Sequence, residues 1–243
     1  MSSTTNSKQE ISFPAPMPAR QFFTGTLHHL LFLAFMVPAA LALGNPPAGN
    51  QEFFSLDGLF WFRLGVAVPV AHQVIVWLGF RSQLCFRIFS RLFGRMDIAV
   101  WGVVFLPLLV LRVVSLVASG LTDQGSLGLN RTLAVPAGLA MIGLAFYTLW
   151  SVFRYFGLAR ALGADHFRAE FRDLPFEARG AFRLSDNAMY TFAFLGLWGA
   201  ALLLDSRNAL ALAAFQHAYI WVHWYCVEAP DIAFIYKNPG SHD

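Results

Sequence analysis

Acidic, amide and phenol side chains flank the last two apolar stretches of the sequence, where together they could bind a positively charged ligand. The stretches cover roughly residues 188–204 and 209–226, with only a short polar connection between them. Two antiparallel passes return a chain to the side that it left, so we expect the polar residues at both ends of this hairpin to meet. These residues are Asp186, Asn187, Tyr190, Glu228 and Asp231. Such a cluster suits an amine, a ribose diol or a sulfonium ion.

Helix capping is the alternative interpretation of the first part of this cluster. Asp186 and Asn187 precede an apolar stretch, and such side chains readily accept hydrogen bonds from the free amides of a helix start. Glu228 and Asp231 instead follow an apolar stretch, where acidic residues oppose the helix dipole. That placement costs stability unless a cation lies nearby, which favours a binding role for the second pair.

The composition predicts that membrane-spanning helices position this cluster. Hydrophobic residues make up 57% of the 243 residues and charged residues only 13%, well below the quarter typical of soluble domains. The apolar runs long enough to cross a bilayer lie near 27–44, 59–79, 98–119, 133–153, 188–204 and 209–226. We therefore expect an all-α fold, a polytopic transmembrane helical bundle of about six spans that ends in a helical hairpin.

The distribution of basic residues predicts the orientation of these spans. Thirteen of the 17 Lys and Arg residues lie in the two tails or in the segments 80–95 and 154–187. The loops between them carry few, so the positive-inside rule places the basic segments and both termini in the cytoplasm. The sequence thus predicts a multi-pass protein of a bacterial inner membrane or an ER-type membrane, with the mouth of the last hairpin on the cytoplasmic side.

The two basic segments are also rich in phenylalanine, and two interpretations of them stay open. They either anchor the protein by charge alone or dock lipid headgroups beside the hairpin. Other chemistries find no support in the sequence. No His-x-x-x-His spacing predicts a metal site, no Gly-x-Ser-x-Gly motif predicts a nucleophilic serine, and no phosphate-binding loop is present. We expect neither a metal nor a nucleic-acid partner.

The order of motifs after residue 132 resembles the phospholipid N-methyltransferases of the phosphatidylethanolamine type and, more distantly, the isoprenylcysteine carboxyl methyltransferases. Members carry Gly-x-Gly in the span before the linker, and Gly143-Leu144-Ala145 stands there. A phrase like Leu-Asp-Asn-Pro-Met-Tyr opens their hairpin, matched by 184–190, and Glu-Glu-Pro closes it, matched by Glu228-Ala229-Pro230. Ala145, Ala188 and Ala229 depart from the family pattern.

The resemblance implies methyl transfer from S-adenosylmethionine to a lipid headgroup amine, that of phosphatidylethanolamine or its methylated forms, at the cytoplasmic interface. It implies that Gly143, Leu144 and Ala145 let the cofactor approach closely, although small residues also serve helix packing. Glu228 would hold the polar end of the cofactor. Asn187 and Tyr190 would shape the pocket, and Asp186 and His166 are candidates for relieving the acceptor of its proton.

Three regions follow from this interpretation: a disordered N-terminal tail over 1–25, N-terminal transmembrane helices over 26–131, and a methyltransferase-like core over 132–243. Two alternatives to lipid methylation stay open. The acceptor could be a thiol, a carboxylate or another amine. The three alanines that depart from the family pattern also fit a non-enzymatic relative that serves as a membrane binding or scaffold protein.

Overall fold

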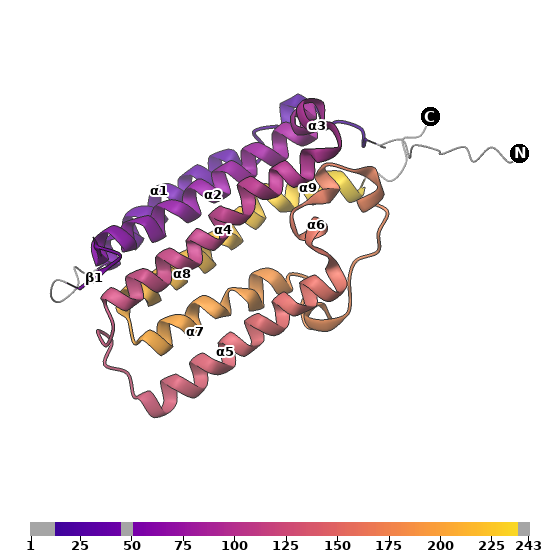
Figure 1. Cartoon of the computed structure of the whole chain (residues 1–243). Coiled ribbons are helices and arrows are strands. Elements are labelled where there is room, and N and C mark those ends of the chain that lie inside the picture. The colour runs from indigo at the N-terminus through magenta and orange to yellow at the C-terminus, as the bar shows by residue number, and fades with distance from the viewer. Residues whose placement is uncertain (1–12, 45–50, 238–243) are drawn as a thin grey trace, which may run out of the picture.

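A computed structural model describes residues 13–44 and 51–237, and in these residues the chain is almost entirely helical. Six helices run along a common axis (Figure 1). They are α1 (Thr26–Leu43), α2 (Gly58–Phe86), α4 (Asp97–Thr122), α5 (Arg131–Ser151), α7 (Leu195–Leu204) and α8 (Arg207–His223). Shorter helices are α3 (Ile88–Phe93), α6 (Leu158–Ala161) and α9 (Ala229–Lys237), and strands β1 (Glu52–Phe53) and β2 (Leu56–Asp57) pair antiparallel. The predicted all-α bundle is confirmed.

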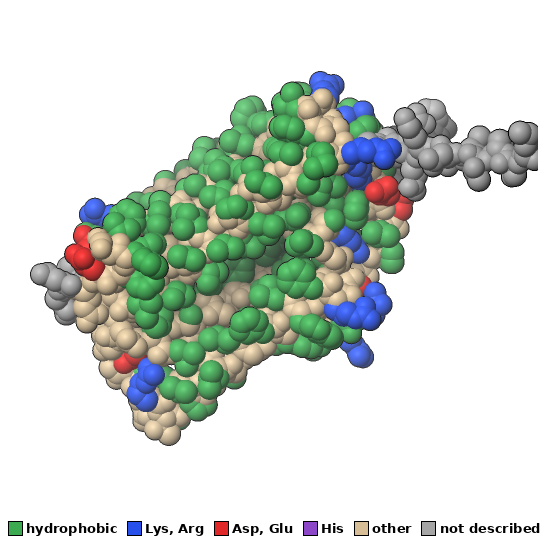
Figure 2. All heavy atoms as spheres, viewed as in Figure 1, with side chains coloured by type: hydrophobic (Ala, Val, Ile, Leu, Met, Phe, Trp, Pro, Cys, Tyr) green, Lys and Arg blue, Asp and Glu red, His purple; other side chains and the backbone are tan. Residues whose placement is uncertain are grey.

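Within the described part of the chain, four helical segments are long and apolar enough to cross a membrane. They are Ala19–Leu43, Gly58–Phe86, Ile88–Thr122 and Arg131–Phe156, and the hairpin adds the shorter apolar helix Met189–Leu204 before α8. Figure 2 shows a wide band of hydrophobic side chains between two ends that carry charged ones. The bundle therefore has the surface of a membrane protein, and α7 and α8 of the final hairpin are shorter than the other four long helices.

Helices α5 and α7 pack so closely that their backbones nearly touch. A Cβ atom built on Gly199 would lie 2.6 Å from the carbonyl oxygen of Gly138, and one built on Gly196 would lie 3.1 Å from the Cβ of Ala145. Small side chains at this interface let the two helices approach. The pair forms one side of the bundle, and α1, α2, α4 and α8 form the other (Figure 1).

One end of the bundle gathers α3, α6, α9 and the linker between α5 and α7 (Figure 1). We call it the arginine-rich end, because it holds the arginines of 80–95 and 154–187. A buried ion pair ties the linker to α4 there. Arg168 of the linker places two nitrogens 2.5 Å from the carboxylate oxygens of Asp97, and the Ser90 hydroxyl donates to the same carboxylate at 2.6 Å.

The N-terminal segment, residues 13–25, is packed against this end, which corrects the prediction of a disordered tail from Phe13 onward. Met17 is 3% exposed, and its amide donates to the Leu84 carbonyl at 2.9 Å. Arg87 donates to the Pro14 carbonyl at 2.6 Å. The polar composition of the tail suggested disorder, but Arg81 of α2 and Arg87, which follows α2, donate to its carbonyl groups, and Met17 fills an apolar site. Residues 1–12 of the predicted tail lie outside the described residues.

Three π-helical turns lie at the arginine-rich end. They are Val152–Phe156 after α5, Met189–Ala193 before α7 and Trp224–Glu228 after α8. A π turn closes each hydrogen bond over five residues instead of four, and such turns occur often at functional sites. A π turn therefore lies at the start of the hairpin, at its end, and at the end of α5, the helix before the linker.

Candidate active site

Glu228, the last residue of the π turn after α8, carries its carboxylate between two partners. The Tyr190 hydroxyl donates a hydrogen bond to Oε2 from the turn that opens the hairpin. His223 places Nε2 3.4 Å from Oε1. The Glu228 side chain keeps 16% of its surface exposed, while that of His223 is fully buried. The hairpin thus brings its two ends together around one partly accessible carboxylate.

Burial raises the pKa of Glu228 to about 7, against the opposing effects of the Tyr190 hydrogen bond and the charge of His166. Nearby Asp231 and Asp165 raise it further. The group lies past the end of α8, so it is charged about half of the time near neutral pH. A bound cation would favour the charged form, and a carboxylate in this state is suited to bind one.

Behind Glu228 lies a short series of buried polar side chains from α1 and α8. The ring of His223 lies 5.9 Å from that of His29, edge to face. His29 in turn shares a hydrogen bond of 2.9 Å with the Tyr219 hydroxyl. These residues fix the His223 ring from its far side and thereby limit where Glu228 can lie.

A second polar group surrounds Asp231, which is fully buried one turn beyond Glu228. Arg81 of α2 places Nε 2.6 Å from Asp231 Oδ1. His166 of the linker places Nε2 3.6 Å from Asp231 Oδ2. Asp231 lies in the first turn of α9 and not at a helix C-terminus as expected, because the helix continues past Glu228. Asp231 is therefore engaged within the protein and does not replace the missing acid at Ala229.

His166 is held as a cation by its surroundings. Its Nδ1 lies 2.9 Å from Asp165, which also accepts a hydrogen bond from the Tyr236 hydroxyl at 3.0 Å. Its ring stacks on Phe80 at 4.0 Å between centroids. Burial opposes the charged form, but the two carboxylates outweigh it and raise the pKa of His166 to about 9. At neutral pH the ring is already protonated, which favours a structural role over proton acceptance.

The other predicted site residues lie at different places. Asp186 is exposed, and Asn187 is partly buried, its amide donating to Ser185 Oγ at 3.2 Å. Neither side chain caps the turn that follows. Gly143 is exposed, with open space where a side chain would be, and Leu144 is partly buried beside it. Ala145 is 5% exposed and faces α7. The structure thus joins Tyr190 with Glu228 directly and leaves Gly143 on an open helix surface.

Four residues of the site were missed in the sequence: Arg81, His29, His223 and Asp165. Arg81 is one of four arginines in 80–95, and His223 belongs to no metal-ligand spacing, so neither stands out in the sequence. Arg81 lies on the packed face of α2, nine residues past the middle of the helix, and this position near the end of an apolar run is the signal that could have found it. Among the described residues, no group of three or more His, Cys, Asp or Glu side chains is arranged to hold a metal ion.

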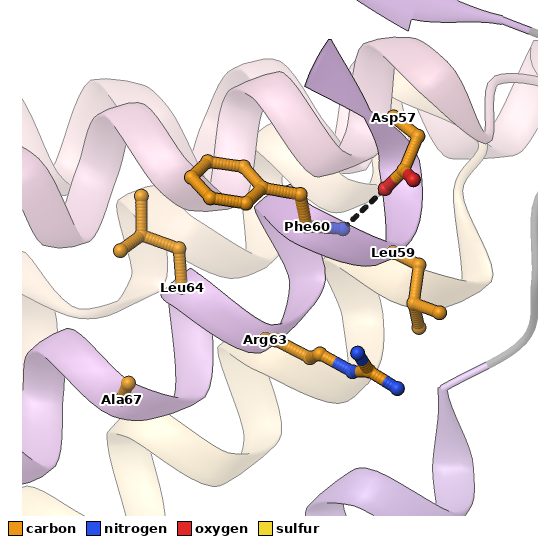
Figure 3. A pocket seen from close by; sticks show the side chains of 6 residues that line it. All are labelled: Asp57, Leu59, Phe60, Arg63, Leu64 and Ala67. Carbon is orange, nitrogen blue, oxygen red and sulfur yellow. Dashed lines mark hydrogen bonds between the residues drawn. The ribbon is translucent and has the colours of Figure 1, made fainter.

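Two surface hollows accompany this arrangement. One, of about 380 Å³, lies at the opposite end of the bundle, where Asp57 accepts a hydrogen bond from the Phe60 amide and starts α2 (Figure 3). Its lining is Asp57, Leu59, Phe60, Arg63, Leu64 and Ala67. The other, of about 450 Å³, is in the linker at the arginine-rich end, between Tyr155, Arg160 and Arg179. Phe176 in its wall contacts Tyr236 at 5.1 Å, which connects this linker hollow to Asp165.

Comparison with known proteins agrees with the motifs of the hairpin. The family model described as phospholipid methyltransferase matches residues 133–239. Neither the curated proteins nor the solved structures gave a match. The matched part contains α5, the linker, the hairpin and both Tyr190 and Glu228, so the resemblance seen in the sequence is confirmed. Residues 133–239, less than half of the chain, are thus similar to the phospholipid methyltransferases.

Proposed function

We propose that the protein transfers a methyl group from S-adenosylmethionine to the amine of a lipid headgroup, that of phosphatidylethanolamine or its methylated forms. The observation that carries the proposal is the carboxylate of Glu228, held between Tyr190 and His223 inside the matched domain. S-adenosylmethionine supplies an electrophilic methyl group on a positively charged sulfur. The residues present fit this group, because Glu228 is partly accessible and, within 13–44 and 51–237, it forms no salt bridge with Lys or Arg.

In this proposal the chain contributes binding, orientation and charge. Glu228 holds the polar, positively charged end of the donor, and Tyr190 and Asn187 shape the pocket around it. The open surface at Gly143, with Leu144 and Ala145 beside it, supports close approach of the donor to α5. Holding both reactants in line can lower the barrier by on the order of 7–11 kcal/mol at best.

The acceptor nitrogen must be unprotonated before it can attack. Asp186 is proposed as the proton acceptor, because it is an exposed acid at the arginine-rich end beside Asn187. His166 fits this role less well, since its two carboxylate neighbours keep it protonated at neutral pH. We assign His166 instead to holding the linker against α9.

The linker hollow supports a lipid headgroup as the acceptor. The Arg160 guanidinium lies 4.7 Å from the Phe156 ring centroid, so a cation lines an aromatic wall. The Arg179 guanidinium lies 5.1 Å from the Tyr155 ring centroid and pairs with Glu177 of the same hollow at 2.8 Å. We propose that a headgroup phosphate binds there. By the positive-inside rule, the arginine-rich end with both chain ends is proposed to face the cytoplasm.

Lipid analysis tests the proposed function. Expression in a host that lacks phosphatidylcholine should produce mono-, di- or trimethylated headgroups detectable by mass spectrometry, and Glu228→Gln should abolish them. Absence of methylated lipids from cells with inserted, folded wild-type protein would contradict the lipid acceptor.

Titration with S-adenosylmethionine separates the remaining alternatives. Donor binding without lipid methylation would favour a thiol, carboxylate or other amine as acceptor. No donor binding by the wild-type protein would favour the non-enzymatic relative.

A further inference from the structure

Arg81 joins three parts of the chain that are far apart in sequence. Its side chain is fully buried in α2, pairs with Asp231 of α9 at 2.6 Å and donates to the Val227 carbonyl at 3.3 Å. It also donates to three carbonyl groups of the N-terminal segment, those of Gln21, Phe22 and Thr24. A planar guanidinium with five donors suits such a hub, because it can serve several acceptors at fixed angles.

The N-terminal segment also contacts the π turn that carries Glu228. Gly25 approaches Cys226 so closely that a Cβ atom on it would lie 2.0 Å from the Cys226 carbonyl oxygen. Gly25 has a φ of +79°, a conformation that L side chains rarely adopt. Further along the segment, Met17 packs with Leu84, Cys85 and Ile235 in one buried cluster.

We infer that Arg81 is a positioning residue of the methyl-donor site and that the N-terminal segment forms one wall of it. The inference rests on the proposed function, and it adds residues that lie outside the matched 133–239. Val227 directly precedes Glu228, and Asp231 follows one turn later, so Arg81 holds the chain on both sides of the carboxylate. Glu228 therefore meets Tyr190 only while the N-terminal segment stays docked.

A matched pair of glycine substitutions tests this wall without removing any charge. In Gly25→Ala the new methyl group displaces the segment from Cys226. In Gly125→Ala the backbone has nearly the same φ, +81°, but no atom lies within 4 Å of the new group. Both full-length variants carry similar backbone strain, because alanine is unfavourable at these positive φ angles. A difference between the two variants therefore reports the loss of the contact between Gly25 and the π turn.

Two measurements on these variants read the outcome. The first is the rate at which a maleimide modifies Cys85, located by peptide mass spectrometry, because Cys85 is 8% exposed in the cluster with Met17. The second is the dissociation constant for S-adenosylmethionine. We expect Gly25→Ala to speed the labelling by about tenfold or more and to weaken donor binding by about fivefold or more, with Gly125→Ala within about twofold of wild type in both.

The Arg81→Gln/Asp231→Asn double variant tests Arg81 itself while leaving no unpaired buried charge. We expect it to raise the KM for the donor by about fivefold or more with the KM for the headgroup nearly unchanged. Equal changes in both constants, or none, would overturn the positioning role.

The two proposals fail in different ways. Unchanged Cys85 labelling in Gly25→Ala, or faster labelling with wild-type donor affinity, would overturn the wall. No donor binding by the wild-type protein would overturn the proposed function, and the labelling comparison would still decide whether the segment is docked against the π turn.

Discussion

The Tyr190 hydroxyl donates a hydrogen bond to the Glu228 carboxylate, and this contact joins the first turn of the hairpin to its last. The contact orients the carboxylate and lowers its pKa against the effect of burial. The charge of the candidate site is therefore set by both ends of the hairpin.

Tyr190→Phe should weaken binding of S-adenosylmethionine at pH 7 by about tenfold, the equivalent of about 1.4 kcal/mol. Without the donated hydrogen bond the pKa of Glu228 rises further, so less of the carboxylate is charged. Isothermal titration at pH 7 and pH 8.5 measures the loss and its partial recovery at the higher pH. Tyr225→Phe is the control, because Tyr225 lies on the π turn that carries Glu228 but is 70% exposed. An equal loss in the control would refute this account.

Donor affinity should rise with pH around neutrality. Glu228 binds a cation only as a carboxylate, and its pKa is raised to about 7, so affinity should increase from pH 6 to pH 8 and then level off. The effect on stability has the opposite sign. Because the folded protein holds this proton between the ordinary pKa of 4.5 and about 7, the contribution of Glu228 to stability falls as pH rises through that window. Glu228→Gln should make both pH profiles flatter, and an unchanged affinity profile would remove Glu228 from the site.

His166→Gln should destabilise the protein at pH 6 by on the order of 2–3 kcal/mol. The pKa of His166 is raised from 6.5 to about 9, so its contribution is fully present below pH 6.5 and is lost as pH rises through about 9. Thermal unfolding from pH 6 to pH 9.5 should show a decline for wild type that is smaller in the variant. His28→Gln, at an exposed position of α1, should behave as wild type. Identical declines in both variants would argue against the buried ion cluster.

Gly143→Ala and Gly199→Ala should separate the effect of α5 on donor binding from its effect on packing against α7. The methyl group of Gly199→Ala meets the Gly138 carbonyl, so this change should cost about 1–3 kcal/mol of stability. Gly143 has open space beside it, so Gly143→Ala should leave the unfolding temperature unchanged and weaken donor binding by about fivefold. Wild-type donor affinity in Gly143→Ala would move the donor away from this part of α5.

Arg168→Met should destabilise the protein by about 3–5 kcal/mol, because it leaves the buried carboxylate of Asp97 without its partner. The double variant Asp97→Asn/Arg168→Met removes both charges and should recover most of this loss. Unfolding temperatures of the two single variants and the double variant give the coupling energy. A coupling near zero would mean that the pair does not hold the linker to α4.

The helical hairpin and its polar mouth could be predicted because they follow from run length alone. Two apolar stretches with a short connection must return the chain to its starting side, so Tyr190 and Glu228 had to lie at one end. The family motifs then pointed to the same residues, and the matched range 133–239 agrees.

The partners of these residues could not be predicted in the same way. Arg81 lies 146 positions before Val227, and nothing local distinguishes it from the other arginines of 80–95. Arg112, in the middle of an apolar run, is 3% exposed and donates to the Gln216 side chain at 3.2 Å. Such contacts depend on which faces of distant helices pack together. The docking of the N-terminal segment could not be predicted for the same reason, because its carbonyl groups accept hydrogen bonds from Arg81 and Arg87, far along the chain.

The π turn Trp224–Glu228 adds one residue to the helical turn after α8, and this extra residue sets the direction in which Glu228 points. In a regular α-helix His223 and Glu228, five positions apart, would point roughly 140° away from each other, yet here they lie 3.4 Å apart. Removing one residue from this turn would keep the span, its composition and its charge, but it would swing the carboxylate off the face shared with Tyr190. Insertions and deletions of one residue here can therefore create or abolish the site in related chains, and an alignment without gaps would overlook them.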